Sequence, residues 1–366
     1  MSNIYRAKGE SLVDQYEDVG RLFAKALQKE FANPPDPLTV KHQIAARILE
    51  RVQTESIFTE FYACFKAWVR GGGISELYGM YLMVDNLEGC QTMMVRYQSG
   101  VGMIHTEEDF NDIKSRMSGN HTIEFKDNGR RLLTLVYNNL IPGSALFGWQ
   151  KDMLIAVDAL FIREEGIENI EKPMLANIIG WIVWHATVDE TDHRVLIPKL
   201  KRMGEMIDGY AINVVRRIGK KVQGYKVSFA RNDWEVEKLG NKIGSNLRQV
   251  NLLEPHYVGE NRSIMEWQAP REAIGFYGEL MFRLQNMREL AEKYQKWLSV
   301  KLEADKVEKI HLYIMYLMFQ KYRSDFVNED MGAACVGIVD SEIGTSVSTK
   351  LNDEREITKL EYIDQQ

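Results

Sequence analysis

Apolar residues at helical spacing dominate the first 88 positions of the chain. Between positions 12 and 27 they recur every three or four residues, as in an amphipathic helix, and Asn33-Pro34-Pro35 ends that pattern. The Gly71-Gly72-Gly73 run lacks the Lys and Ser/Thr of a phosphate-binding loop and follows no strand, so we interpret it as a helix break. The same spacing predicts three further helices, at 40–52, 57–69 and 75–84.

From Cys90 onward the pattern changes to short alternating runs that are typical of strands. We expect strands at 91–97, 102–106, 121–126, 132–138, 152–158, 209–216, 223–229, 233–238, 334–340, 345–351 and 357–363. Helical spacing returns at 174–187, 189–206, 264–297 and 305–322. The Asp127-Asn128-Gly129 sequence predicts a tight hairpin. Because strands come in adjacent hairpins, the order predicts antiparallel sheets between helical layers and not a doubly wound parallel sheet.

Composition narrows the classes of function. The chain has 366 residues, of which 45% are hydrophobic and 27% charged, which suits one compact globular unit. A formal net charge of -6 disfavours a nucleic-acid partner, since phosphate binding needs clustered Lys and Arg. The basic pairs Arg216-Arg217 and Lys220-Lys221 are expected in a solvated hairpin turn. No apolar run reaches the roughly 18 residues that a membrane span requires, so no membrane association is expected.

The cysteines and the N-terminus bear on the compartment. Cys64, Cys90 and Cys335 are odd in number and widely separated, which favours free thiols over a disulfide framework. The first twenty residues lack the apolar core of a signal peptide. We therefore expect a cytoplasmic protein.

The stretch from Gly89 to Phe110 carries the strongest chemical signal. Cys90 follows a glycine and opens a predicted hairpin whose turn is Gln98-Ser99-Gly100. The second strand ends in the acidic run Glu107-Glu108-Asp109, so antiparallel pairing would bring a carboxylate back toward the thiol. A lone cysteine at the start of a strand is more often a small buried apolar residue, so this spacing leaves both readings open.

Two other kinds of site have weaker support. His185, Asp189 and His193 would share one face of a continuous helix and could ligate a metal. Thr187-Val188-Asp189-Glu190 instead predicts a helix break and a new helix start, which would separate the histidines. We therefore expect no metal, and the absence of a G-x-S-x-G motif argues against a serine triad. Trp149, Trp181 and Trp184 are expected in the core.

Several ordered motifs over about 200 residues resemble one family. Cys90 to Phe110, with Glu108-Asp109-Phe110 at its end, is similar to the start of the catalytic subunit in the isopenicillin-N (acyl-coenzyme A:6-aminopenicillanate) acyltransferase family, which includes carcinine-hydrolase-like amidases. These are N-terminal-nucleophile hydrolases. Further similar segments are Ile141–Leu160, Gly209–Val214, Gln249-Val250-Asn251 and Phe282–Leu290. The chain departs from the family pattern at Gln91, Gln150 and Leu252.

The resemblance implies an αββα sandwich of two antiparallel sheets between helical layers. It implies self-cleavage between Gly89 and Cys90, giving a helical pro-segment of residues 1–89 that stays packed on a catalytic region of residues 90–366. Its catalytic residues would be Cys90, Asp109, Asn251 and Arg283, with Thr92 and Glu108 in support. The new α-amine, with a reference pKa of about 7.7 to 8.0, would serve as the base for its own thiol.

The expected function is therefore hydrolysis of a linear amide or thioester, or acyl transfer to an amine, through a thioester on Cys90. No cofactor is expected, although acyl-coenzyme A is a candidate co-substrate. The expected partners are a small acyl-amide, or an acyl donor with an amine, and the chain's own N-terminal fragment; a homo-oligomer is compatible with the sequence. The alternative is a relative that keeps the fold, never matures, and has a binding or structural role.

Overall fold

The computed structural model describes most of the chain up to residue 239 and several shorter segments beyond it. The described residues are 4–31, 39–84, 89–96, 100–108, 121–143, 146–160, 166–239, 243–245, 333–341, 344–351 and 361–362. Within them the chain forms two main β-sheets and a set of α-helices, so the protein has a mixed α+β fold.

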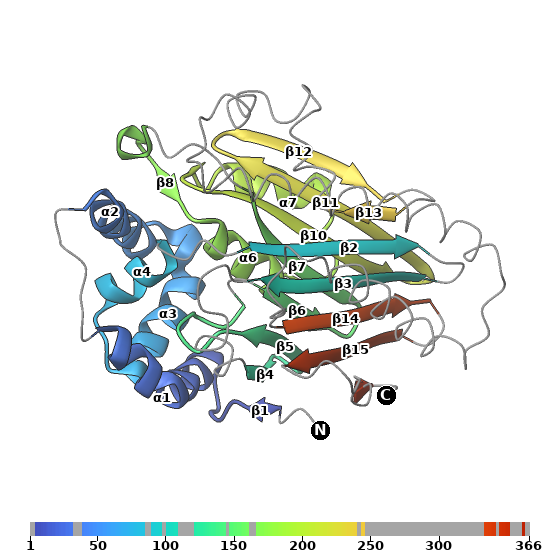
Figure 1. The fold of residues 1–366 in the computed structure, drawn as a ribbon, viewed down its shortest axis with the longest axis horizontal. Coiled ribbons are helices and arrows are strands. Elements are labelled where there is room, and N and C mark those ends of the chain that lie inside the picture. Colours follow the sequence, from blue (N-terminus) through green and yellow to red (C-terminus); the bar gives the residue numbers. More distant parts are fainter. Residues whose placement is uncertain are drawn as a thin grey trace, which may run out of the picture.

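Eight of the described strands form the first sheet, which lies behind the second in the view of Figure 1. Their spatial order is β1 (Tyr5–Arg6), β4 (His121–Asp127), β5 (Arg130–Val136), β6 (Leu146–Gln150), β7 (Met153–Leu160), β10 (Gly209–Ile218), β11 (Lys221–Ala230) and β12 (Asp233–Lys238). Neighbouring strands are antiparallel except β1 and β4, which are parallel. The predicted hairpin between β4 and β5 is confirmed, with φ of 49° at Asn128 and 81° at Gly129.

Six of the described strands form the second, fully antiparallel sheet. Their order is β13 (Ile243–Ser245), β2 (Gly89–Arg96), β3 (Gly100–Glu108), β14 (Ala333–Asp340), β15 (Gly344–Leu351) and β16 (Glu361–Tyr362). A separate parallel pair joins β8 (Pro173–Met174) to β9 (Glu205–Met206).

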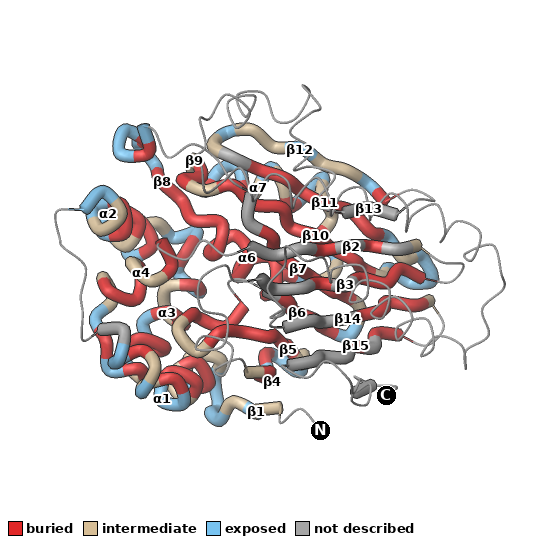
Figure 2. The backbone as a smooth tube through the Cα atoms, viewed as in Figure 1, coloured by how far each residue is buried: buried red, intermediate tan, exposed pale blue. Residues whose placement is uncertain are grey.

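The two sheets pack face to face, and the residues of known burial on their facing sides are buried (Figure 2). A glycine allows the closest approach, because a Cβ atom at Gly337 of β14 would lie only 2.7 Å from Cδ1 of Leu154 on β7. Val101 and Met103 of β3 and Phe147 of β6 belong to the same core. The hydrophobic contact between the sheets therefore fixes their spacing.

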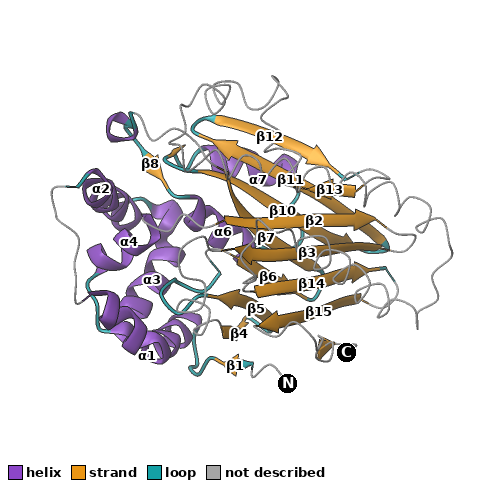
Figure 3. Ribbon diagram, viewed as in Figure 1, coloured by secondary structure: helices purple, strands orange, loops and turns teal. Residues whose placement is uncertain are grey.

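The helices occupy two places, which Figure 3 distinguishes. One end of the molecule holds α1 (Leu12–Phe31), α2 (Val40–Thr54), α3 (Thr59–Gly72) and α4 (Glu76–Val84), with the short 3-10 helices η1 (Ser56–Phe58) and η2 (Ile167–Asn169) nearby. The outer face of the first sheet holds α6 (Ala176–His185) and α7 (His193–Lys201). Every residue of α6 is buried, as expected of a helix that is apolar all round.

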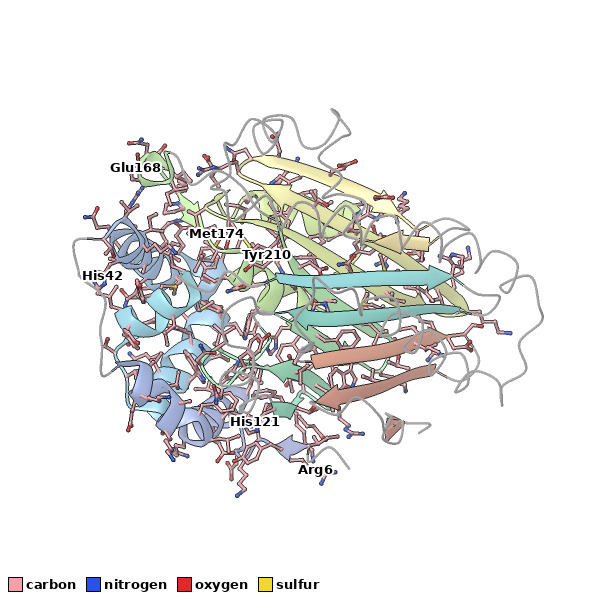
Figure 4. The ribbon with its side chains drawn as sticks, viewed as in Figure 1. Arg6, His42, His121, Glu168, Met174 and Tyr210 are labelled. Atoms are coloured by element: carbon pink, nitrogen blue, oxygen red, sulfur yellow. The ribbon has the colours of Figure 1, made fainter. Side chains whose placement is uncertain are left out.

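The N-terminal segment is tied to the rest of the chain through Tyr16 of α1. Its hydroxyl donates to the carbonyl oxygen of Pro142 (3.0 Å), accepts from Trp181 Nε1 (2.6 Å) and lies 3.0 Å from His185 Nε2. Tyr16 is fully buried and stacks on Phe125 of β4. At the same edge β1 pairs with β4, and Figure 4 labels Arg6 and His121 on these two strands. The first ninety residues thus contribute a strand and core side chains to the larger part.

Most of the expected elements are confirmed. The four N-terminal helices are present, and α3 ends where Gly73 adopts a left-handed conformation (φ 68°), as the triple glycine predicted. The three tryptophans are buried. Strands β1, β6, β8, β9 and β13 were not predicted. The expected helix at 189–206 is wrong at both ends, because Asp192 caps α7 at its start and residues 205–206 form β9. The expected helices at 264–297 and 305–322, and with them the second helical layer, lie outside the described residues.

The expectation that the basic pairs lie in a solvated turn is right for Lys220 and Lys221 and wrong for Arg216. Its guanidinium is buried against the outer face of the first sheet, where it donates to Asp192 Oδ2 (2.9 Å) and Gln223 Oε1. Arg217 also has a partner, Asp152. The charge of Arg216 is tolerated because the carboxylate of Asp192 and neutral acceptors surround it.

Asp192 gives a pH-dependent prediction. Hydrogen bonds from the side chain and backbone of Arg194, together with those from Arg216, hold the pKa of Asp192 well below its ordinary value. A depressed carboxylate pKa stabilises the fold above the unfolded value and loses that effect in acid. Asp192→Asn is therefore expected to lower the free energy of unfolding by about 2 kcal/mol at pH 7 and by progressively less below about pH 4. Denaturant titrations at several pH values measure this, with exposed Asp189→Asn as the control; a penalty unchanged at pH 3 would contradict it.

Candidate functional site

The hairpin that begins with Cys90 has the antiparallel pairing that the sequence predicted. Helix α4 ends at Val84 and β2 begins at Gly89, so the Gly89-Cys90 bond lies between a helix and a strand. In the register of β2 and β3, Cys90 is opposite Glu107, and Gly89 is opposite Glu108, the last residue of β3. Asp109, Asn251 and Arg283 lie outside the described residues. Of the expected site, the structure therefore brings together Gly89, Cys90, Thr92 and Glu108 at the level of the strands.

A buried polar network begins two residues after Cys90, at Thr92. The Thr92 hydroxyl donates to Asp158 Oδ1 (2.9 Å) and lies 2.8 Å from His105 Nδ1. Asn213 Nδ2 donates to the other carboxylate oxygen of Asp158 (2.6 Å). The four side chains are at most 1% exposed. Thr92 and His105 come from the second sheet and Asp158 and Asn213 from the first, so the network crosses the sandwich.

The hydrogen bonds of this network have a defined direction. A hydroxyl carries one proton, and that of Thr92 is given to Asp158, so its contact with His105 requires a proton on Nδ1 of the imidazole. His105 thus donates to Thr92, Thr92 donates to Asp158, and Asn213 donates to Asp158 from the other side. His105 Nδ1 is also 3.5 Å from Asp158 Oδ1. A carboxylate held by several donors is the form in which a buried aspartate is tolerated.

Three members of the network, His105, Asp158 and Asn213, were not identified from the sequence as site residues. Asp158 and Asn213 are each the single strongly polar residue in an otherwise apolar stretch, Met153–Leu160 and Gly209–Val215, whereas His105 is followed by further polar residues in β3. A lone polar residue within a buried strand is a usable signal, because it must find a partner when it is buried. Which partner it finds depends on the pairing of distant strands.

The alternative metal site does not form. His185 ends α6 and His193 begins α7, and between them Thr187 and Glu190 bond to each other as in a capping box. The Nε2 atom of His185 lies within hydrogen-bonding distance of the Tyr16 hydroxyl. Burial and the nearby positive charge of Arg130 lower the pKa of His185 well below its ordinary value. In the part of the chain that the structure describes, no group of His, Cys, Asp or Glu is arranged to hold a metal ion.

Cys64 provides a contrast with Cys90. It is 1% exposed on α3, and burial, with the nearby carboxylates of Glu60 and Asp127, raises its thiol pKa far above the ordinary value. Since only a thiolate reacts readily, an alkylating reagent is expected to label Cys90 in the folded protein well before Cys64. Peptide mapping by mass spectrometry after short exposure measures both sites. Equal labelling at both, with the fold intact, would contradict an activated thiol at Cys90.

Comparison of the chain with family models and with curated proteins found no match in either case. The helices within the described residues are all too short or too polar to cross a lipid bilayer.

Proposed function

We propose that this protein is a cysteine-dependent N-terminal-nucleophile amidase or acyltransferase that matures by cleavage between Gly89 and Cys90. One observation supports this most: Cys90 is the second residue of β2, opposite an acidic residue and two positions before the buried network of Thr92. Two antiparallel sheets packed face to face, with helices on one outer side, are compatible with the αββα architecture that the proposal requires.

Maturation would use the thiol of Cys90 on its own peptide bond. The sulfur attacks the carbonyl carbon of Gly89 and the peptide nitrogen leaves, taking up a proton, so a thioester replaces the amide. Water then hydrolyses the thioester. The products are a carboxylate at Gly89 and a free thiol and α-amine at Cys90. A free α-amine titrates near neutral pH and can serve as a base.

In the mature protein, that amine would take the thiol proton as the sulfur attacks the substrate carbonyl carbon. The tetrahedral intermediate expels the amine of the substrate, which receives a proton, and leaves an acyl thioester on Cys90. Water completes an amidase cycle, whereas a second amine completes acyl transfer. Asn251 would donate to the oxyanion, and Asp109, held by Arg283, would orient the α-amine. These three roles come from the resemblance.

The Thr92 network would hold the strand of Cys90 in place. Thr92 is held in position by its bond to Asp158 of the first sheet, which Asn213 also binds. Cys90 is about 7 Å away along the strand of Thr92. A nucleophile gains rate from a fixed position, because small displacements from the productive geometry are costly. The proposal thus gives the buried polar cluster a positioning role.

The intact mass of the purified protein tests the proposal. Two fragments are expected, residues 1–89 and 90–366, that remain together in gel filtration, and the protein should hydrolyse some members of a panel of linear acyl-amides. An unbroken 366-residue chain without activity would overturn the proposal.

The second candidate is a relative that never matures and binds a partner or ligand. One observation favours it: Gly89 is already part of the β-ladder, opposite Glu108, in the uncleaved chain. The same mass measurement separates the two candidates, and specific binding without cleavage would favour this one.

A further inference from the structure

A ring of polar side chains surrounds Ala211 on the inner face of the first sheet. Ala211 of β10 pairs with Asp158 of β7 on one side and with Ser228 of β11 on the other. Two residues along, Asn213 pairs with Lys226. Residues directly or diagonally opposite on one face of a sheet are neighbours. Asp158, Asn213, Lys226 and Ser228 therefore border the small methyl group of Ala211 on three sides, and we call them the Ala211 ring.

Two atoms of this ring lack partners among the described residues. They are Asn213 Oδ1 and Ser228 Oγ, both on fully buried side chains. The Nδ2 atom of Asn213 donates to Asp158, so the carboxylate of Asp158 does not serve as the partner of Oδ1. Each buried polar atom left without a partner costs about 1 to 3 kcal/mol. Two such atoms at neighbouring positions are the arrangement expected where a ligand completes the hydrogen bonding.

The ring lies close to the proposed nucleophile. Thr92 of β2 bonds directly to Asp158, and Figure 1 shows β2 crossing in front of β7 and β10. Cys90 is two residues, about 7 Å, from Thr92 along the strand, so Asp158, the nearest member of the ring, is about 10 Å from its position. A substrate whose carbonyl is at Cys90 would need a chain of about eight bonds to extend to the ring.

The charges and hydrogen-bonding atoms of the ring limit the ligand. Lys226, whose ammonium contacts Glu237 Oε2 at 2.8 Å, disfavours a cationic group, and the carboxylate of Asp158 disfavours an anionic one. Asn213 Oδ1 can only accept a hydrogen bond, whereas the Ser228 hydroxyl can donate or accept. A neutral group with both a donor and an oxygen acceptor satisfies both atoms, and an apolar group satisfies neither.

We propose that the Ala211 ring is a specificity subsite for a neutral polar group, a hydroxyl or a carboxamide, carried by the substrate about eight bonds from its scissile carbonyl. The inference rests on the proposed function and narrows it to polar acyl-amides. A site built to hydrogen-bond a substrate group discriminates strongly against the analogue that lacks it, because its own buried atoms are then left unpaired.

The test uses matched acyl-amides that differ only in a hydroxyl or carboxamide replaced by methyl. The wild-type protein is expected to prefer the polar member in kcat/KM by at least about tenfold, and Ser228→Ala should reduce that preference severalfold while folding as well as the parent. Exposed Ser56→Ala should leave the preference unchanged. Equal rates for both members, or a preference that survives in Ser228→Ala, would overturn the subsite.

A second measurement separates failure of the subsite from failure of the proposed function. If the wild-type protein turns over no acyl-amide, the same matched pairs are tested as ligands by their effect on Tm. If the polar member alone raises the Tm of the wild-type protein, and does not raise that of Ser228→Ala, the subsite is supported even without turnover. Equal or absent shifts overturn it.

Discussion

Cys90→Ala is expected to leave a single 366-residue chain and to lower acyl-amide turnover by at least about a thousandfold. Alanine has no sulfur to attack Gly89 or to form the acyl thioester, so cleavage and turnover are lost together. Any remaining acceleration over the uncatalysed reaction in water would come from substrate binding alone. Intact mass and steady-state kinetics measure the two effects on one preparation. The fold should survive, because Cys90 lies at the N-terminal end of β2, before the network that begins at Thr92.

Cys64→Ala is the matched control for this prediction. It also removes a thiol, but one buried on α3 within the core. The Cys64→Ala variant should be cleaved and should turn over substrate as the parent does, with only a small loss in its free energy of unfolding. If Cys90→Ala retains substantial turnover, or if Cys64→Ala abolishes it, Cys90 is not the nucleophile.

Asp158→Ala is expected to lower the free energy of unfolding by about 2 to 5 kcal/mol, because at least two buried donors lose their acceptor at about 1 to 3 kcal/mol each. Three donors or near neighbours, on Thr92, His105 and Asn213, lose their shared acceptor within a fully buried site. Chemical denaturation at neutral pH measures the effect.

The control for Asp158→Ala is Asp152→Ala in the neighbouring turn. Asp152 pairs with Arg217, but its side chain is 28% exposed, so a loss below about 1 kcal/mol is expected. Thr92→Val should lower the free energy of unfolding less than Asp158→Ala does. The double variant should lose less than the sum of the two single losses, because both changes remove the same hydrogen bond. A loss of about 1 kcal/mol or less for Asp158→Ala would contradict the network as a stabilising element.

Local patterns predicted the local structure. The helical period of α1 to α4, the Asp-Asn-Gly turn and the alternation of β2 and β3 each depend on residues close in sequence, and each is confirmed. Strand β6 was missed because both its faces are buried: Trp149 faces the core, while Gly148 packs under Trp184, where a Cβ would lie 2.4 Å from the indole. Such a strand shows no alternation.

The network could not be predicted for a different reason. Thr92, His105, Asp158 and Asn213 meet only because β2 and β3 pack on β7 and β10, and their sequence separations carry no information about that packing. The hairpin opposite Cys90 was predictable because its two strands are adjacent in sequence. The strand that carries the proposed nucleophile could therefore be predicted from the sequence, whereas the buried residues that position this strand could not.

The attachment of the N-terminal segment has a consequence for how a cleaved protein would be assembled. Strand β1 pairs with β4, and the hydroxyl of Tyr16 on α1 bonds to the carbonyl oxygen of Pro142 and to Trp181 of α6. A chain lacking residues 1–89 would expose the edge of β4 and a hydrophobic face around Phe125, both prone to aggregation. The two fragments would therefore form a heterodimer whose one-to-one stoichiometry is set at translation, since both derive from one polypeptide that folds before it is cut. Equal supply of the subunits would then need no separate control of their expression.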